Sequence, residues 1–338
     1  IIVEKLQIKR SPINLIKSYF GFPCLNVYRN YSLTFKQKIH SIAQNFDAII
    51  IDHYEMFQYV PSKYSGKVIM HTHNAEFMLW QRMGELSMNP VAKVLLKLEA
   101  QRVRKYEQEI FSSSDLIYST PSDIELYKQH GFNTEKHKLT YHLGKDDLLK
   151  MPNLSFNETE GALSFMGTLS WEPNIDGLLW FIKKVWPQII EKKPESRFYI
   201  MGKKGDHRIY QAAKPYQSII FTGFVKDLDQ YLQKTTVYIA PLRFGSGMKV
   251  KVLEGLYRGV PMVSTSVGAE GLELENEKHI LIADSPKDFA EACLRLLEDQ
   301  TLWERLRDNS RSIAEEKFKW EPLFERMNKE LLKILQDS

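Results

Sequence analysis

The sequence predicts an α/β protein with two Rossmann-like domains that face each other across a cleft, followed by C-terminal helices. Short β-branched segments alternate with amphipathic stretches along most of the chain, which is typical of parallel sheets covered by helices. The chain has 338 residues. A single hydrophobic core rarely supports a chain of this length, so two domains are expected. A polar segment without periodicity, residues 151–161, is interpreted as the linker between them.

Each half contains its own alternating series. The first predicts strands at residues 48–51, 67–71, 116–119 and 139–142, with helices at 91–111 and 122–129. The second predicts strands at 162–167, 197–202, 219–222, 237–241, 261–265 and 280–283, with helices at 174–192, 226–234, 248–258, 286–299, 302–317 and 321–335. We therefore expect a first domain at residues 1–150, a second at 151–319, and a C-terminal helix at 320–338 that packs back towards the first domain.

Composition excludes several classes of protein. The chain is 43% hydrophobic and 26% charged with a net charge of +4, unlike disordered, collagen-like or coiled-coil proteins. No apolar run approaches the roughly 18 to 20 residues that span a bilayer. Cys24 and Cys293 are too isolated for a disulfide framework or a thiolate zinc site, which favours the cytoplasm. The chain starts with neither Met nor a signal-peptide layout, so we expect an N-terminally incomplete first domain.

The first 45 residues are basic and rich in aromatic side chains. Glu4 is their single acid, against Lys5, Lys9, Arg10, Lys17, Arg29, Lys36 and Lys38. This mixture suits an anionic membrane surface or a phosphate-bearing partner, and a solvated face beside a core explains it equally well. The expected location is therefore cytoplasmic, with peripheral contact to the inner membrane face as an option. Nucleic acid is not expected, because the remaining residues carry no recognised binding motif.

One strand-to-helix loop has the residues of an anion site. Residues 237–241 form a predicted buried strand, 242–247 a glycine-rich turn, and 248–256 the start of a helix. Free backbone N–H groups at a helix start bind phosphate, and glycines let the backbone approach it closely. Lys251 and Glu254 share one helix face, so together they suit a nucleoside diphosphate and its ribose. The alternative is an ordinary surface pair next to a tight turn.

Residues 240–265 resemble the nucleotide-sugar signature of the retaining glycosyltransferases of family 4, which have the GT-B fold. Supporting segments lie around it at 165–174, 199–202, 221–225 and 267–271, and looser ones at 71–76, 106–107 and 114–117. The resemblance implies an acceptor-side domain followed by a donor-binding domain. It also implies a hexosyltransferase-like, metal-independent enzyme of bacterial polysaccharide or envelope synthesis, which needs no cofactor. Such an enzyme moves a sugar from a nucleotide-diphosphate-sugar donor to a hydroxyl of a glycan or lipid-linked acceptor.

The resemblance also assigns roles to residues. Glu254 stands where the family binds the donor ribose, and Ser246 replaces the family's other glutamate, as in a branch with an Arg-x-Gly-Ser-Gly loop. His73 stands where the family's acceptor domain reaches the transferred sugar, and is the expected catalytic residue. The donor diphosphate is expected to contact Arg243, Gly245, Ser246, Gly247 and Lys251. Other candidates for the donor site are Gly167, Thr168, Gly202, Phe224, Val225 and Gly268.

Alternatives remain for the histidines and for the function. His71 and His73 lie two apart on a predicted strand and so point to one side, as two metal ligands would. No third ligand with suitable spacing is evident, so no metal is expected. His73 could instead be a core histidine bonded to backbone. The function could also be that of a nucleotide-sugar epimerase of related fold, or of a non-catalytic nucleotide-sugar-binding protein.

Overall fold

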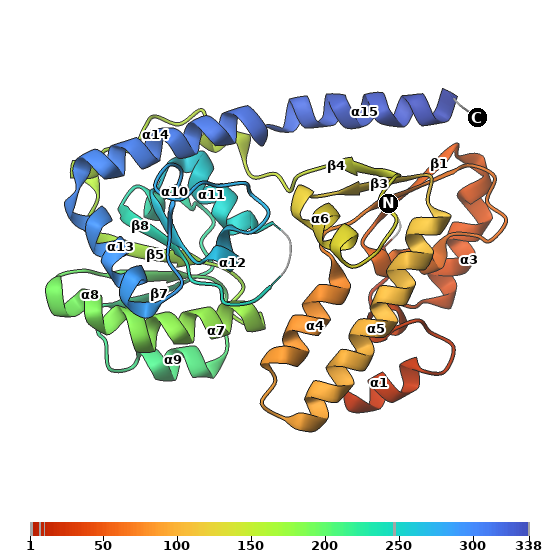
Figure 1. Cartoon of the computed structure of the whole chain (residues 1–338), viewed down its shortest axis with the longest axis horizontal. Helices are drawn as coiled ribbons and strands as arrows, with labels where there is room; N and C mark the ends of the chain where they lie inside the picture. The colour runs from red at the N-terminus through yellow and green to blue at the C-terminus, as the bar shows by residue number, and fades with distance from the viewer. Residues whose placement is uncertain (1–2, 7, 10, 246–247, 337–338) are drawn as a thin grey trace. The chain divides into compact units, whose positions relative to one another are not determined.

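The computed structural model describes residues 3–6, 8–9, 11–245 and 248–336, and these fold into two compact units (Figure 1). The first unit contains residues 1–141 and 322–338, and the second contains residues 142–321. Each unit is built around one parallel sheet with helices packed on it, so the predicted α/β class with two Rossmann-like halves is confirmed.

The sheet of the first unit has four parallel strands in sequence order. They are β1 (Ala48–Asp52), β2 (Lys67–His71), β3 (Leu116–Ser119) and β4 (His137–Leu139). Three of them lie where the sequence predicts. The fourth prediction, residues 139–142, is wrong, because the strand already ends at Leu139 and the chain leaves this unit after Tyr141.

The long helix α5 (Pro90–Ser113) holds the N-termini of two other helices of the first unit. Two of its glutamates are buried and accept hydrogen bonds from the backbone at the N-termini of two shorter helices: Glu99 from Leu25 and Glu107 from Glu76 and Phe77. A carboxylate at a helix N-terminus satisfies otherwise unpaired N–H groups and the helix dipole. The helices are α1 (Pro12–Ser18), α2 (Leu25–Arg29), α3 (Leu33–Ile42), α4 (Glu76–Leu86), α5 (Pro90–Ser113) and α6 (Pro121–Gln129), with short 3-10 turns at Ala43–Asn45 and Tyr54–Tyr59.

The end of the chain packs on the sheet of the first unit. Helix α15 (Trp320–Gln336) presents Met327, Leu331 and Ile334 at helical spacing, and these side chains contact the cluster of Ile69, Leu116 and Tyr118. The Tyr118 hydroxyl donates to the Met327 carbonyl over 2.9 Å. Among the described residues, no helix is both long and apolar enough to cross a membrane.

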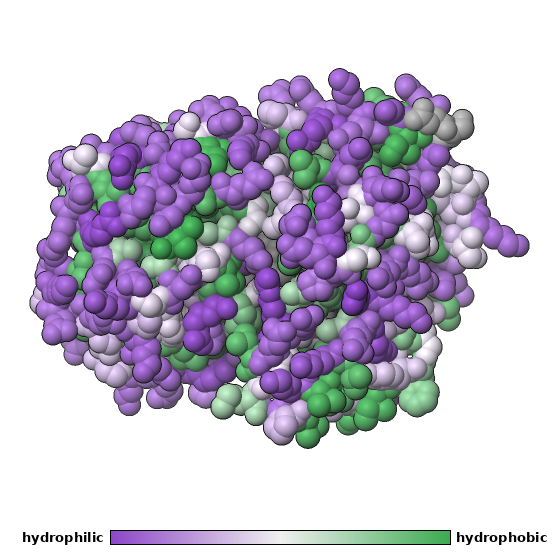
Figure 2. Space-filling view, in the orientation of Figure 1, coloured by the Kyte–Doolittle hydropathy of each residue, from purple (hydrophilic) through white to green (hydrophobic). Residues whose placement is uncertain are grey.

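Apolar side chains also remain on the surface of the first unit. In Figure 2 they gather at the lower edge of the view, over the region of α1 and the turn between α4 and α5. The exposed members of this surface are Ile13, Ile16, Tyr19, Phe20, Leu86, Met88, Val91, Val94 and Leu98. We call them the apolar edge. Apolar side chains that gather on one surface are candidates for contact with another protein or with a membrane.

The sheet of the second unit has six parallel strands, and their order reverses direction once. The order is β10-β9-β8-β5-β6-β7, for β5 (Ala162–Met166), β6 (Phe198–Met201), β7 (Ile219–Gly223), β8 (Thr235–Ala240), β9 (Met262–Ser264) and β10 (Leu281–Ile282). From β5 the chain adds β6 and β7 towards one edge of the sheet, and from β8 it adds β9 and β10 towards the opposite edge. The point where the direction changes lies between the neighbours β5 and β8. Ligands of open parallel sheets bind beyond the carboxyl ends of strands at such a point.

The helices of the second unit cover both faces of its sheet. They are α7 (Glu172–Trp180), α8 (Trp186–Lys192), α9 (His207–Ala213), α10 (Asp229–Leu232), α11 (Val250–Arg258), α12 (Ser266–Ala269), α13 (Pro286–Glu298) and α14 (Gln300–Lys317), with 3-10 turns at Asp146–Leu148 and Phe156–Glu158. The sequence predicts one helix over residues 174–192, but a π-helical turn, Phe181–Val185, interrupts it. Pro187, the second residue of α8, has no backbone N–H to continue the regular α-helical bonding.

Candidate functional site

The carboxyl ends of β5 and β8 bring together the residues of the predicted anion site. The loop after β8 leads into α11, which begins at Val250, and the loop after β5 leads into α7, which begins at Glu172. The two loops are tightly packed. A Cβ on Gly177 of α7 would lie 2.4 Å from the Pro241 carbonyl oxygen, and one on Gly268 would lie 2.5 Å from the Ala240 carbonyl oxygen. Gly268, a predicted donor-site residue, is therefore required for packing around the end of β8.

Lys251 lies at the centre of this edge of the sheet. Its ammonium donates a hydrogen bond to Oδ1 of Asn174, and lies 4.9 Å from the centre of the Phe165 ring. Burial lowers the pKa of Lys251 to about 7, and the nearby Lys249 ammonium adds to this shift. Among the described residues, no carboxylate forms an ion pair with Lys251. A buried cation without a protein counter-ion is costly unless an anion binds beside it.

Glu254 follows one turn later on the same helix. Its carboxylate is half-buried, and burial raises its pKa above the ordinary value, while the Lys145 ammonium opposes that shift. The helix therefore presents a cation and then a carboxylate along one face, as the spacing predicts. The cation can bind an anionic group of a ligand, and the carboxylate can accept hydrogen bonds from two hydroxyl groups of the same ligand.

Arg243 differs from Lys251, because it already has a carboxylate partner. Its guanidinium makes two hydrogen bonds to Asp176 of α7, from Nε over 2.8 Å and from Nη2 over 2.5 Å. Lys249 is buried and lies 3.9 Å from the Glu270 carboxylate. Of Arg243, Lys249 and Lys251, Lys251 is the one that the fold has buried without an ion-paired carboxylate in the described part of the chain.

The glycine-rich turn is described only in part. Gly245 has a φ of +147°, a conformation that side chains with a Cβ rarely adopt. Ser246 and Gly247, both predicted to contact the diphosphate, lie outside the described residues.

The remaining donor-site candidates fall into two groups. Gly167, Thr168 and Gly202 lie at the ends of β5 and β6. A Cβ on Gly202 would be 2.3 Å from the Gly167 carbonyl oxygen. The Thr168 carbonyl accepts a hydrogen bond from the Asn174 side chain. Gly167 and Thr168 thus lie next to Asn174, the hydrogen-bond partner of Lys251. Phe224 and Val225 instead follow β7 at the edge of the sheet, two strands from β5. Phe224 is 65% exposed, and Lys203 lies over its ring.

The first unit has a second cluster of functional side chains at the carboxyl edge of its own sheet. Asp52 ends β1 and pairs in register with His71, which ends β2. The same carboxylate oxygen, Oδ1, lies 2.9 Å from Nδ1 of His71 and 2.6 Å from Nε2 of His73. One ligand atom from each of these three residues lies within 4.8 Å of the others. The expectation that the two histidines lack a third potential ligand is therefore wrong.

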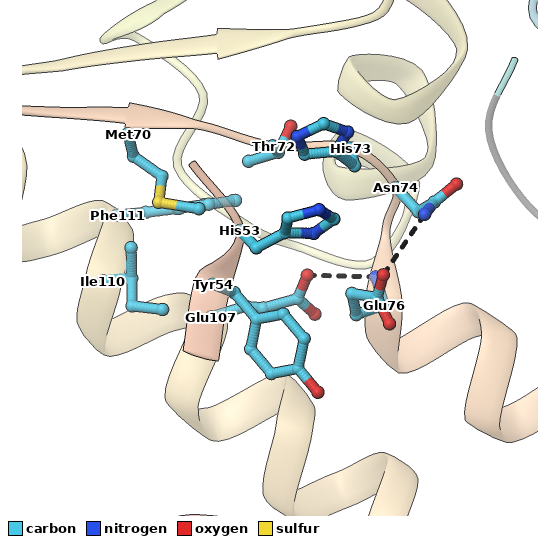
Figure 3. A pocket seen from close by; sticks show the side chains of 10 residues that line it. All are labelled: His53, Tyr54, Met70, Thr72, His73, Asn74, Glu76, Glu107, Ile110 and Phe111. Carbon is cyan, nitrogen blue, oxygen red and sulfur yellow. Dashed lines mark hydrogen bonds between the residues drawn. The ribbon is translucent and has the colours of Figure 1, made fainter. Parts of the chain in front are cut away.

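His73 is held in place by its neighbours. The His53 ring stacks on it with the ring centres 3.9 Å apart and the planes 10° from parallel (Figure 3). Burial is the main cause that lowers the pKa of His73 to about 4. The nearby His53 and His71 lower this pKa further, whereas Asp52 acts to raise it. Burial acts to raise the pKa of Asp52, but the hydrogen bonds with His73 and His71 outweigh it and lower that pKa. The imidazole of His73 is thus neutral, and the carboxylate charged, at neutral pH.

The loop that carries His73 is fixed at both ends. The Thr72 N–H donates to the Tyr118 carbonyl over 2.9 Å, and the Ala75 N–H donates to the Asp123 carboxylate over 2.9 Å. Glu107 then accepts from the next two N–H groups, and Figure 3 shows its carboxylate directed at the start of α4. Beside this loop lies a cavity of about 10 Å³, the space of one water molecule. Burial, with Glu76 adding to it, raises the pKa of Glu107 to about 8.

Part of the second unit matches a known protein family. Residues 160–299 match the family described as Glycosyl transferases group 1. A relative in Klebsiella pneumoniae, an uncharacterized 44.6 kDa protein in the cps region, is 23% identical over 269 residues, 78% of this chain and 68% of that protein.

Two solved structures share the fold of most of the chain. Anabaena Alr3699/HepE in complex with UDP superposes with a TM-score of 0.69 and 13% identity over 89% of this chain and 82% of its own. A mutant form of S. aureus TarM, in complex with fondaparinux, alpha-GlcNAc-glycerol and UDP, gives a TM-score of 0.67 and 14% identity over 89% of this chain. The matched part is only 58% of the TarM chain. These likenesses confirm the expected GT-B fold.

Proposed function

We propose that this chain, whose residues 160–299 match the glycosyl transferases group 1 family, transfers a sugar from a nucleotide-diphosphate-sugar to a hydroxyl group of a glycan or lipid-linked acceptor, with retention of configuration. The Klebsiella relative lies in a cps region, which supports a role in bacterial polysaccharide synthesis. Both solved structures named above contain UDP, so a UDP-sugar is the first donor to test.

The buried ammonium of Lys251 is the observation that carries this proposal. In glycosyl transfer, negative charge develops on the departing diphosphate, and groups that stabilise this charge lower the barrier. Lys251 sits at the switch point of the sheet in the first turn of α11, where backbone N–H groups also favour an anion. Glu254, one turn further on, is the proposed acceptor of hydrogen bonds from the ribose hydroxyls.

His73 is the proposed catalytic residue of the first unit, in contact with the transferred sugar. Its neutral imidazole can exchange hydrogen bonds with sugar hydroxyls at the pH of a cell. The stacked His53, the Asp52 carboxylate and the anchored backbone hold the ring in one orientation. A fixed ring loses little freedom when the sugar binds.

A donor screen followed by product analysis tests the function. We expect one class among UDP-, GDP-, ADP- and dTDP-sugars to raise the melting temperature of the chain, because a ligand that binds only the folded state stabilises it. With that donor and an acceptor, the expected product is the elongated acceptor with a retained anomeric configuration. An epimerase would instead convert the donor in the absence of acceptor, and a non-catalytic binder would bind the donor and release neither product nor free sugar.

The apolar edge supports a further part of the proposal, contact with an anionic membrane that carries the acceptor. Met88 is 97% exposed, Val91 and Val94 lie one turn apart on α5, and Lys93 and Lys97 lie beside them on the same helix. Apolar side chains next to lysines suit a lipid surface with negative headgroups. We expect salt-sensitive sedimentation with anionic vesicles that the V91S/V94S double variant weakens. Leu332→Ser, an exposed apolar residue of α15, is the control, and equal sedimentation of both variants would contradict this surface.

A further inference from the structure

The geometry points to a binding site for a divalent transition-metal ion, formed by Asp52, His71 and His73. This inference goes beyond the proposed function and does not depend on it. Two imidazoles and one carboxylate are the ligand set of several catalytic zinc sites, which keep a fourth position for water or another oxygen. The set occupies the carboxyl edge of the sheet, where parallel strands bring side chains from distant segments together.

The spacing of the three ligand atoms is close to what such an ion requires. A tetrahedral ion with bonds of about 2.0 to 2.1 Å holds its ligand atoms about 3.3 Å apart. Here Asp52 Oδ1 lies 2.9 Å from His71 Nδ1 and 2.6 Å from His73 Nε2, and all three atoms lie within 4.8 Å of one another. Small side-chain rotations that separate the carboxylate from each ring by a few tenths of an ångström, and draw the two rings together, would bring the atoms onto one ion.

The backbone holds these ligands in position before an ion binds. Asp52 and His71 are register partners on β1 and β2, so their Cα positions are set by the sheet. Thr72, between the two histidines, is tied to β3 through its N–H and through a 2.8 Å hydrogen bond from its hydroxyl to Ser119. His53 has a φ of +76°, which is uncommon for a residue with a side chain, and its ring fixes the plane of His73 by stacking. A site with little freedom left to lose binds its ligand more tightly.

The charges and the exposure of the cluster also suit a cation. The Asp52 carboxylate supplies one negative charge, and its side chain is 63% exposed, so an ion can reach it from solvent. Imidazole nitrogens and a carboxylate oxygen together favour Zn²⁺, Fe²⁺ or Co²⁺ over Mg²⁺ and Ca²⁺, which prefer sites made of oxygen alone. A bound ion would leave a coordination position open for one oxygen atom, from water or from a hydroxyl group.

Metal titration of the whole chain tests the inference. After treatment with a chelator and buffer exchange, the protein is titrated with Zn²⁺ by calorimetry, and with Co²⁺ while visible absorption bands are recorded. We expect one ion per chain, and Co²⁺ bands that Zn²⁺ abolishes by competition. Asp52→Asn and His71→Ala should each lower the affinity at least tenfold, because loss of a ligand costs no less than the loss of an outer-shell partner.

Control variants distinguish binding at this site from binding elsewhere on the chain and from loss of folding. His207→Ala removes a histidine whose side chain is 85% exposed in the other unit, and it should leave the affinity unchanged. Asp52→Asn keeps the shape of an exposed side chain, so it should fold as the unchanged chain does, and circular dichroism checks this. Absence of stoichiometric binding by the unchanged chain would overturn the site. Binding that neither Asp52→Asn nor His71→Ala weakens would overturn it as well, since the ion would then lie elsewhere.

Discussion

The two units use the same edge of a parallel sheet for opposite electrostatic purposes. At the edge of the second unit, the fold buries the Lys251 ammonium with a neutral amide, Asn174, as its hydrogen-bond partner. At the edge of the first unit, it surrounds the Asp52 carboxylate with two imidazole rings. The first arrangement suits an anion, and the second suits a cation or a hydroxyl group. The two units thus share the topology that places side chains at the carboxyl edge of a sheet, and they differ in the charge of the side chains placed there.

The two edges also differ in how their loops are held. The loop after β2 is fixed by the buried carboxyl groups of Asp123 and Glu107, which accept hydrogen bonds from three consecutive N–H groups. The loop after β8 is held by close contacts at Gly177 and Gly268 and by the bidentate pair of Arg243 with Asp176. Hydroxyl groups of the neighbouring β9 segment also donate to its carbonyls, from Ser264 to Ala240 and from Thr265 to Leu242. Loss of a buried carboxylate should therefore affect the whole first unit, whereas changes at the second edge should act mainly on ligand binding.

The largest expected effect is on stability, from Glu107→Ala. This substitution leaves the N–H groups of Glu76 and Phe77 and the hydroxyl of Tyr127 without the buried partner that they share, and it opens a cavity. We expect the free energy of unfolding to fall by about 3 to 5 kcal/mol, measured by urea denaturation. Glu107→Gln keeps the volume and one acceptor oxygen and should cost less than half as much. A loss under about 1 kcal/mol for the alanine variant would contradict the role of Glu107 in holding this loop.

Lys251→Met separates ligand binding from stability at the second edge. Methionine keeps the length and apolar contacts of the stem but removes the charge, so nucleotide-sugar affinity should fall by about 2 to 3 kcal/mol, roughly 30- to 150-fold. Stability should fall by no more than about 1 kcal/mol at any pH, because relief of the buried charge offsets the lost hydrogen bond to Asn174. Calorimetric titration and urea denaturation measure the two quantities, with the exposed lysine variant Lys287→Met as the control. Unchanged affinity would remove Lys251 from the donor site.

Proton uptake on donor binding tests the charge at that edge directly. In the free chain, burial followed by Lys249 lowers the pKa of Lys251 to about 7, so the amine is mostly neutral at pH 8 and mostly protonated at pH 6. A diphosphate bound beside it favours the ammonium and raises the pKa. Binding should thus take up more protons at pH 8 than at pH 6, up to about one per site. Calorimetry in buffers of different ionisation enthalpy measures this uptake, and Lys251→Met should abolish the difference between the two pH values.

The same pKa fixes the sign of the effect on stability without ligand. The folded chain binds fewer protons at Lys251 than the unfolded chain does between pH 7 and the ordinary lysine pKa of 10.5. Stability from this group therefore rises as the pH increases through that window, and it is lowest below pH 7. Lys251→Met should flatten this part of the pH profile, whereas the control variant Lys287→Met should keep it.

Local sequence patterns predicted the strands and the helix of the second edge, because Lys251 and Glu254 depend only on helical spacing. The features missed depend on contacts between distant segments. Asp52 could be placed beside His71 only from the register of β1 on β2. The N-cap residue of helix α4, Ala75, has no side chain that can accept a hydrogen bond. Glu107, thirty residues further along the chain, accepts from the first N–H groups of this helix instead. Tertiary contacts of this kind leave no periodic signal.

The pairing of Arg243 with Asp176 is another nonlocal contact, and it yields the smallest expected effect. The pair is bidentate but partly exposed, with 48% of the arginine side chain accessible, so solvent screens it and it should contribute at most about 1 kcal/mol to stability. Asp176→Asn removes the competing negative charge from the arginine. If Arg243 contacts the diphosphate only after leaving Asp176, nucleotide-sugar affinity should rise two- to threefold in this variant and fall in Arg243→Gln. If both variants bind like the unchanged chain, Arg243 serves only to join the loop after β8 to α7, and Lys251 is left as the cation that distinguishes the second edge from the first.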